Sequence, residues 1–347
     1  MSFTVMHLSD THRAKADPIS NKELISALLS DRGRQAALSP PIPPPDIIVV
    51  SGDLVQGLQL GSGLHPTELE KQYAEAEELL SLLAKHFLDG DRSRLIVVPG
   101  NHDVDWAVAR MGMTPATANE QEEVKLPSAL QDADSPYRWS WQERKLFRIE
   151  DNAAYENKMQ PYRAMHARFY DKLTAAIPIE SSRDWNLFSV HGGRIVVAAF
   201  ESTHRNDCYR FAGSIRKEAI AEAHLAIRQL PTAPDLLIAT WHHGLQGDPD
   251  HNDYLDTGAI HRMVDCGFRV GLHGHHHRSM VAPFAMFGSE ESMVLIGAGS
   301  LCAGNRELPT GSFRHYNMIV VDDSMASARL HVRHMASEGG FSAATVA

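Results

Sequence analysis

The sequence predicts a layered α/β fold with a mostly parallel β-sheet. Apolar residues make up 43% of the 347 residues, which is enough for a full core without disulfides. Short β-branched runs at residues 47–50 and 95–98 are typical of buried parallel strands. Between them, residues 67–87 place apolar side chains at spacings of three and four, which predicts an amphipathic helix. A strand, a helix and a second strand in this order form the β-α-β unit of parallel sheets.

Strands and helices continue to alternate along a domain that we place at residues 1–335. A first strand is predicted from Phe3 to Leu8, then a helix at 20–38 and a proline-rich connection at 39–45. Further helices are predicted at 161–176, 214–230 and 257–265, and further strands at 186–191, 195–200, 236–240, 269–272, 293–296, 315–321 and 329–332.

Two segments lack the pattern of alternating strands and helices. Residues 104–160 are polar with few aliphatic runs, so we expect an inserted cap, part loop and part helix. Residues 336–347 are small and polar, and we expect a flexible C-terminal tail.

Charge and cysteine content exclude some classes of protein. The formal net charge of −10 argues against a broad basic surface for long nucleic acid, which makes nucleic acid a less favoured partner. Cys208, Cys266 and Cys302 are far apart and lack a Cys-x-x-Cys spacing, so a disulfide framework is not expected. No apolar run reaches the length of a membrane span, and the first strand begins almost at the N-terminus. We therefore expect a cytoplasmic protein without a membrane partner.

Polar side chains follow the predicted strands at the point where each strand ends. The residues in question are Asp10, His12, Asp53, Asn101, His102, His242, His275 and His277. The carboxyl ends of the strands of an open α/β sheet meet at one edge, and ligands bind there. We therefore expect these side chains to converge.

The residue types indicate a metal site. Imidazole and carboxylate together suit Mn, Fe, Zn, Co or Ni better than Ca, and Mn is the ion that we favour. The Asp10-x-His12 and His275-x-His277 spacings place alternate side chains of an extended chain near one point. With Asp53 and two further residues, the ligands are too many for one ion and suit two ions about 3.5–4 Å apart.

The ordered motifs resemble those of the calcineurin-like metallophosphoesterase superfamily. They are Asp10-x-His12, Gly52-Asp53, Gly100 to Asp103, His242 and Gly274 to His277, and the resemblance covers roughly residues 3–335. It implies a layered α/β/β/α fold, in which a mixed β-sandwich is flanked by helices.

The resemblance also implies a role for each motif residue. Asp10, His12 and His277 would hold a first metal; Asn101, His242 and His275 would hold a second; Asp53 would bridge the two. His102 would act beside the leaving group, and Asp103 would orient His102 by accepting its other N–H.

A metal-dependent phosphoesterase is the expected function. We favour a phosphodiesterase for a small or nucleotide-like diester, acting by in-line attack of a metal-bridging hydroxide. A nuclease of the same chemistry and a phosphomonoesterase are the alternatives. A catalytically silent scaffold is the least favoured, because the motifs keep every ligand.

Other residues near the motifs have two interpretations each. His243, Arg13 and Asn305 are candidate substrate contacts. The alternative for His243 is a supporting position behind the metal ligands, for Arg13 a solvated surface position, and for Asn305 an ordinary loop. His273 and His276 are expected to pack rather than to bind metal. The segment 137–145 mixes aromatic and basic residues, which is typical of a stacking platform for a base or of an amphipathic cap; we favour the cap.

Overall fold

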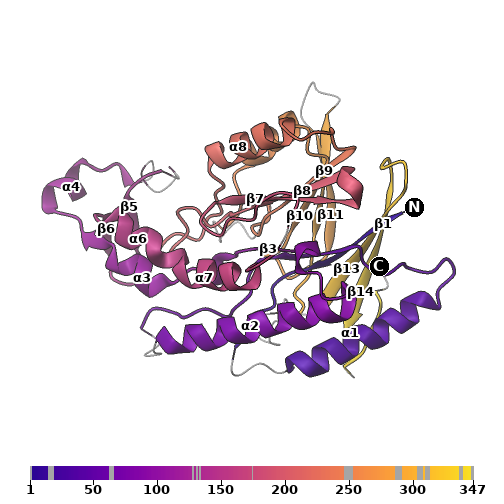
Figure 1. Ribbon diagram of the computed structural model, residues 1–347. Coiled ribbons are helices and arrows are strands. Elements are labelled where there is room, and N and C mark those ends of the chain that lie inside the picture. The colour runs from indigo at the N-terminus through magenta and orange to yellow at the C-terminus, as the bar shows by residue number, and fades with distance from the viewer. Residues whose placement is uncertain are drawn as a thin grey trace.

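Two six-stranded sheets pack face to face at the centre of the computed structural model (Figure 1). The structure describes residues 2–14, 19–61, 66–126, 129, 132, 134–173, 175–245, 253–285, 291–302, 308, 313–335 and 339–344. The first sheet has the order β15-β14-β13-β1-β2-β3 and the second the order β11-β12-β10-β9-β8-β7. Parallel and antiparallel pairs occur in both sheets, which confirms a mixed sandwich.

The strands of the first sheet are β1 Phe3–Leu8, β2 Ile47–Ser51, β3 Leu95–Val98, β13 His315–Val321, β14 Ala328–Met335 and β15 Phe341–Ala343. The strands of the second sheet are β7 Trp185–Val190, β8 Ile195–Phe200, β9 Leu236–Thr240, β10 Val270–His273, β11 Met280–Ala285 and β12 Ser292–Gly297.

Helices cover the outer faces of both sheets and complete the predicted α/β/β/α arrangement. On the side of the first sheet lie α1 Asn21–Ala36, α2 Pro66–Phe87 and α7 Gln160–Phe169; on the side of the second lie α8 Lys217–Arg228 and α9 Thr257–Asp265. Ser20 and Glu23 form a capping box that begins α1. The predicted face of α2, from Leu69 to Phe87, is buried against the first sheet, so apolar burial rather than propensity alone holds this helix.

The insertion at 104–160 is more ordered than the sequence suggested. It contains α3 Trp106–Met111, α4 Ala118–Glu123 and α6 Asn152–Glu156, and a three-stranded sheet of β4 Met113–Pro115, β5 Tyr137–Ser140 and β6 Lys145–Ile149. It has a small core of its own, in which Phe147 and Tyr155 are fully buried. The strands were missed because each has at most five residues, and β5 and β6 also carry charged residues.

Three other expectations differ from the structure. The helix predicted at 161–176 ends at Phe169, and Lys172 adopts a left-handed φ of 59°, which is incompatible with continued helix. Strand β11 was not predicted. Part of the expected flexible tail is ordered, because Phe341–Ala343 pairs with β14 and buries Phe341.

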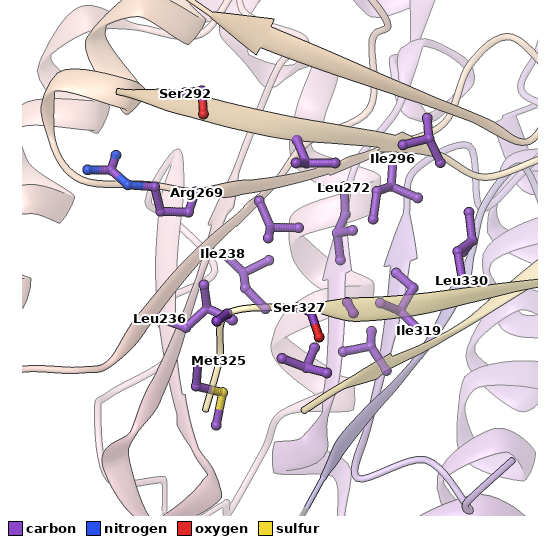
Figure 2. Close-up of a pocket in the computed structure, with 17 residues that line it drawn as sticks. Leu236, Ile238, Arg269, Leu272, Ser292, Ile296, Ile319, Met325, Ser327 and Leu330 are labelled. Carbon is purple, nitrogen blue, oxygen red and sulfur yellow. The ribbon is translucent and has the colours of Figure 1, made fainter. Parts of the chain in front are cut away.

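An apolar cavity of about 430 Å³ lies between the sheets (Figure 2). Its lining includes Leu236 and Val270, near the starts of β9 and β10, whereas the metal-site motifs follow the ends of these strands. Of the lining residues that the structure describes, Arg269 alone is charged. The chemistry-bearing residues and this cavity therefore occupy opposite ends of the sandwich. Among the described residues, no helix has the length and apolarity needed to cross a membrane.

Candidate metal centre

Five strand ends deliver the predicted ligands to one point. The structure brings together all of the residues predicted as ligands: Asp10 and His12 after β1, Asp53 after β2, Asn101 after β3, His242 after β9, and His275 and His277 after β10. Three overlapping groups place their ligand atoms within 4.8 Å of one another: Asp10, His12 and His277; His12, Asp53 and His102; Asp53, His242 and His275.

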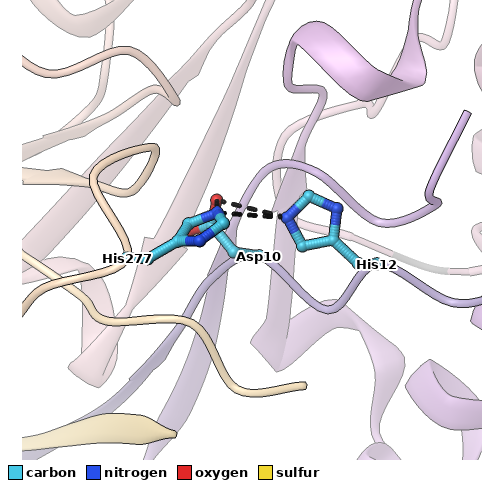
Figure 3. A group of neighbouring side chains, drawn as sticks. All are labelled: Asp10, His12 and His277. Atoms are coloured by element: carbon cyan, nitrogen blue, oxygen red, sulfur yellow. Dashed lines mark hydrogen bonds and ion pairs between the residues drawn. The ribbon is translucent and has the colours of Figure 1, made fainter. Parts of the chain in front are cut away.

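The first group surrounds one oxygen of Asp10. Figure 3 shows His12 and His277 directed at this carboxylate from two different loops. The Nε2 of His277 lies 3.2 Å from Asp10 Oδ1, and the Nε2 of His12 lies 3.8 Å from it. The two Nε2 atoms are 3.2 Å apart. Two imidazoles and a carboxylate thus present their ligand atoms to a common point.

The second group is built around Asn101 and Asp53. The Oδ1 of Asn101 lies 3.0 Å from His242 Nε2 and 3.0 Å from His275 Nδ1. Asp53 Oδ2 is 3.2 Å from His242 Nε2 and 3.9 Å from His12 Nε2. Asp53 therefore stands between the two groups and touches both.

Backbone carbonyls orient two of the imidazoles. His242 Nδ1 donates to the carbonyl of Ser51 at 2.8 Å, and His102 Nδ1 donates to the carbonyl of Gln56 at 2.7 Å. Each bond turns the ring so that Nε2 faces the centre. His275 uses its two ring nitrogens the other way round. Its Nε2 lies 3.1 Å from Asp253 Oδ2, and its Nδ1 faces the centre.

These residues fit divalent cations. Asp10 and Asp53 are buried, and bringing two carboxylates together in a buried place is costly without positive charge. Asp10 Oδ1 receives no hydrogen bond of acceptable geometry from the described residues, despite its two imidazole neighbours. Imidazole nitrogens and carboxylate oxygens crowded this closely are the donor set of transition metals.

The electrostatics of the cluster agree with a strongly negative centre. Burial alone would raise the pKa of Asp53, but His242 and His102 hold it well below its usual range. Burial alone would lower the pKa of His242, yet Asp53 raises it to about 9. The carboxylates therefore attract protons to His242, and a cation would compete with that proton for Nε2.

Five of the predicted ligand residues have a positive φ, and for the Asp10-x-His12 and His275-x-His277 pairs this differs from the extended geometry expected from the sequence. The values of φ are 52° at Asp10, 40° at His12, 50° at Asp53, 77° at His275 and 54° at His277. For residues other than glycine such a conformation costs on the order of 1–3 kcal/mol each and persists only where the surroundings enforce it. Tight left-handed turns, not extended chain, aim the paired ligands at the centre.

Two motif glycines allow the loops to approach one another. A Cβ on Gly100 would lie 2.1 Å from Asp53 Oδ1, and a Cβ on Gly274 would lie 1.8 Å from Ser9 Oγ. Neither distance is sterically possible. These glycines are needed because side chains of neighbouring loops occupy the space.

The predicted role of Asp103 is wrong. Its carboxylate does not accept from His102, which is bonded to Gln56 instead. Asp103 Oδ2 accepts from the backbone N–H groups of Gly100 at 2.8 Å and Leu54 at 3.1 Å, so it ties the loops after β2 and β3 together. Burial and the nearby Asp53 raise the pKa of Asp103 to about 7.

Two of the three candidate substrate contacts, Arg13 and His243, are buried and bonded within the protein. Arg13 has no exposed surface and donates to the carbonyl of Ile19 at 2.8 Å, so it is neither a solvated side chain nor placed against a substrate. His243 is also fully buried and pairs with Ser202 Oγ at 2.8 Å. Asn305 lies outside the described residues. His273 is buried and stacks on Trp241, in agreement with packing.

Several supporting residues were missed by the sequence analysis. Ser202 Oγ accepts from the backbone N–H of His242 at 3.1 Å, and Asp253 lies beside His275. The carbonyls of Ser51 and Gln56 orient imidazoles. A carbonyl is present at every residue, so no sequence signal marks these two. Asp253 follows no predicted strand, and only the folded chain brings it near His275.

Comparisons with known proteins found a family model and several similar structures. The family model described as calcineurin-like phosphoesterase matches residues 3–279. The structure resembles PhoD, with 9% identity, coverage of 100% of this chain and 72% of that chain, and a TM-score of 0.49. It also resembles a dimetal phosphatase from Danio rerio, with 11% identity, coverage of 94% and 98%, and a TM-score of 0.42.

A third similar structure is the calcineurin-like phosphoesterase YfkN from Bacillus subtilis, with 12% identity, coverage of 97% and 92%, and a TM-score of 0.39. No curated protein matches the sequence. The family match spans well over half of the chain and includes every strand end that carries a ligand. The chain belongs to the calcineurin-like phosphoesterase family and is a metal-dependent phosphoester hydrolase by family.

Proposed function

We propose that the protein is a phosphodiesterase that hydrolyses a small or nucleotide-like phosphodiester with two divalent metal ions. The observation that carries this proposal is the position of Asp53, whose Oδ2 lies 3.2 Å from His242 Nε2 and 3.9 Å from His12 Nε2. One carboxylate between two groups of ligands is the arrangement expected for two ions that share a ligand.

Each group of residues has a separate task. Asp10, His12 and His277 would hold one ion; Asn101, His242 and His275 would hold the other; Asp53 would be shared. When bound, two such ions supply an activated water at neutral pH and neutralise the charge of the phosphoryl oxygens. Mn²⁺ is the ion that we favour, with Fe, Zn, Co or Ni as alternatives, because this donor set accepts all of them.

His102 is placed to transfer a proton to the leaving group. Its backbone N–H donates to Asp53 Oδ1 at 2.9 Å, and its Nδ1 donates to the Gln56 carbonyl at 2.7 Å. These two bonds fix the ring beside the centre with Nε2 as the free position. His102 also lines a cavity of about 530 Å³ that opens onto the centre. A proton held at Nε2 can therefore reach a leaving oxygen in that cavity.

The cavity supports a diester with a substituent of moderate size. A volume of about 530 Å³ lies in the range of roughly 300–1,000 Å³ that small-molecule sites occupy. A net charge of −10 disfavours long nucleic acid, whose binding rests on neutralising many phosphates. These observations support a small diester over a polymeric substrate, and the assay described next separates the two.

Metal reconstitution tests the proposal. The protein is stripped with a chelator, supplied with Mn, Fe, Zn, Co or Ni, and assayed on an aryl phosphodiester, the matching monoester and a nucleic acid. We expect metal to restore activity, with the small diester preferred. A clear preference for the monoester or for nucleic acid would replace the proposal with a phosphomonoesterase or a nuclease, and no turnover with any metal would favour a scaffold.

A substitution at His102 tests its assigned role. His102→Ala should reduce kcat by about 10²–10⁴-fold because proton donation to the leaving group is lost. His224→Ala, in the outer helix α8, is the matched control and should leave kcat unchanged. An unchanged kcat for His102→Ala on a substrate with a poor leaving group would remove His102 from the mechanism.

A further inference from the structure

The cavity beside the metal centre has walls of aromatic side chains. Its lining includes Asn101, His102 and His275 of the centre, so the cavity and the centre are continuous. Its walls carry the aromatic residues Trp106, Tyr137, Trp139, Trp141, Tyr209 and Phe211. Among the described lining residues, Ala212 is the only aliphatic one, whereas the described lining of the cavity between the sheets is mostly aliphatic and has no aromatic ring.

Strand alternation explains one of the walls. In β5 the side chains of Arg138 and Ser140 are buried, and Tyr137 and Trp139 point to the opposite face. Trp141 follows in the turn after β5, and its ring lies 5.9 Å from that of Trp139 in an edge-on arrangement. The aromatic segment at 137–145, interpreted from sequence as a packed cap, therefore presents its rings to the cavity.

One wall of the cavity comes from residues 137–141 and the other from residues 209–212. A buried ion pair connects the two walls. Arg138 Nε donates to Asp207 Oδ2 at 2.6 Å, and Asp207 Oδ1 accepts from the backbone N–H groups of Tyr209 at 2.8 Å and Arg210 at 3.1 Å. Arg138 belongs to the insertion and Asp207 to the segment that carries Phe211. The distance between the walls is thus set by groups that are themselves buried and paired.

Two rings in the cavity have exposed surface that the protein itself does not cover. Trp141 is 82% exposed and Phe211 is 46% exposed. Exposed aromatic surface that borders a catalytic centre is typical of ligand recognition. The aromatic lining and the near absence of aliphatic side chains among the described lining residues suit a planar ring better than an alkyl chain.

We propose that this cavity binds a planar aromatic group of the substrate, a nucleobase in the biological case, by stacking against Trp141 and Phe211. The inference rests on the proposed function, because the ring is taken to be attached to the phosphoryl group that lies at the metal centre. Stacking accepts any base, since every base has a π-face, so the proposal names a substrate class rather than one nucleotide.

Binding of analogues that are not phosphate esters tests the proposal without turnover. The protein as purified is titrated by calorimetry with three phosphonates: the 5′-phosphonate of adenosine, the 5-phosphonate of ribose and benzylphosphonate. We expect the adenosine compound to bind at least tenfold more tightly than the ribose compound, because one base–aromatic contact corresponds to roughly 5- to 150-fold. Benzylphosphonate that binds as tightly as the adenosine compound would identify a small aryl group as the ligand.

Variants assign the effect to the two rings. The double variant Trp141→Ala/Phe211→Ala should lose about tenfold in affinity for the adenosine compound and nothing for the ribose compound. Leu225→Ala, which removes an exposed apolar side chain of α8 that is 62% exposed, is the matched control and should bind as the wild type does.

Equal affinities of the wild type for the adenosine and ribose compounds would overturn the aromatic site. An unchanged adenosine affinity in the double variant would do so as well. Failure of the proposed function gives a different result, namely that the metal-loaded wild type prefers the monoester or nucleic acid or hydrolyses no phosphoester. Discrimination between the analogues is measured independently of that result.

Discussion

Two buried carboxylates in this molecule, Asp31 and Asp10, differ in the groups that surround them and balance their charge. Asp31 in α1 is fully buried, and its carboxylate accepts from Arg333 Nε at 2.8 Å, Gln35 Nε2 at 2.9 Å and the hydroxyl of Tyr316. Asp10 at the metal centre is equally buried, but its Oδ1 receives no well-formed hydrogen bond from the described residues.

The difference lies in the origin of the positive charge. A guanidinium from β14 neutralises Asp31, so this cluster is complete in the folded chain and ties α1 to the first sheet. At the metal centre the neighbours of the carboxylates are imidazoles and an amide, which are good metal ligands, and no guanidinium or ammonium group of the described residues pairs with Asp10 or Asp53. The Asp31 cluster therefore stabilises the fold by itself, whereas the carboxylates of the metal centre require added cations.

The largest expected effect is at the carboxylate shared by the two groups of ligands. Asp53→Asn keeps the shape of the side chain and removes its charge. Turnover should fall on the order of 10⁴-fold, because metal stabilisation of the transition state is worth several kcal/mol. Kinetic assays in saturating Mn²⁺ measure this loss, and circular dichroism checks that the fold survives. Wild-type rates in Asp53→Asn would show that turnover at the metal centre does not depend on the charge of Asp53.

The second-largest effect is expected at Asp31, whose charge is balanced by Arg333 within the folded chain. Asp31→Asn should cost about 3–5 kcal/mol of unfolding free energy, because it leaves Arg333 buried without its anion. Asp235→Asn is the matched control, since Asp235 pairs with Arg194 at the surface and such pairs contribute about 0–1 kcal/mol. Urea unfolding compares the variants, and equal losses for the two would contradict the contrast between buried and exposed pairs.

The pH dependence of the Asp31 effect has a defined sign. Burial alone would raise the pKa of Asp31, but the hydrogen bonds from Arg333 and Tyr316 outweigh burial and lower it. Stabilisation by a carboxyl with a lowered pKa is complete above its ordinary pKa of about 4 and is lost as the pH falls through the folded-state value. The difference in stability between wild type and Asp31→Asn should therefore shrink in acid, as measured by urea unfolding between pH 7 and pH 3.

Metal removal should have a smaller effect on stability. Ions that bind the native state alone stabilise it by about 2.7 kcal/mol at a free concentration of 100 times Kd. Chelator treatment should therefore lower the melting temperature, and Mn²⁺ should restore it. Asp31→Asn should show the same metal-dependent shift as the wild type, because its cluster is separate. A melting temperature that is independent of metal would contradict the assignment of the metal centre.

The smallest effect concerns a residue behind the ligands. Asp253→Asn should weaken metal binding by about 10- to 100-fold, because the carboxylate lies 3.1 Å from His275 Nε2 and favours the orientation in which Nδ1 faces the centre. Competition with a chromophoric chelator measures the affinity. Unchanged affinity would show that Asn101 and the backbone suffice to hold the ring of His275.

The sequence by itself determined the class of fold and which polar residues meet at the candidate metal centre. Continuous β-branched runs require burial on both faces, and the spacing of apolar residues in α2 permits a single buried face, so the layers follow from local patterns. Asp, His and Asn at the ends of these strands must converge once the strands lie parallel, and the structure brings them together.

Only the tertiary structure decided how the ligands are held and what surrounds them. The role of Asp103, the burial of Arg13 and the carbonyl partners of His102 and His242 depend on loops that are distant in sequence. The insertion forms short strands whose pairing is non-local, and its aromatic residues reach the centre through the Arg138–Asp207 pair. Strand patterns are local and periodic, and can be recognised in sequence; contacts between loops are neither, because they arise only when the whole chain has folded.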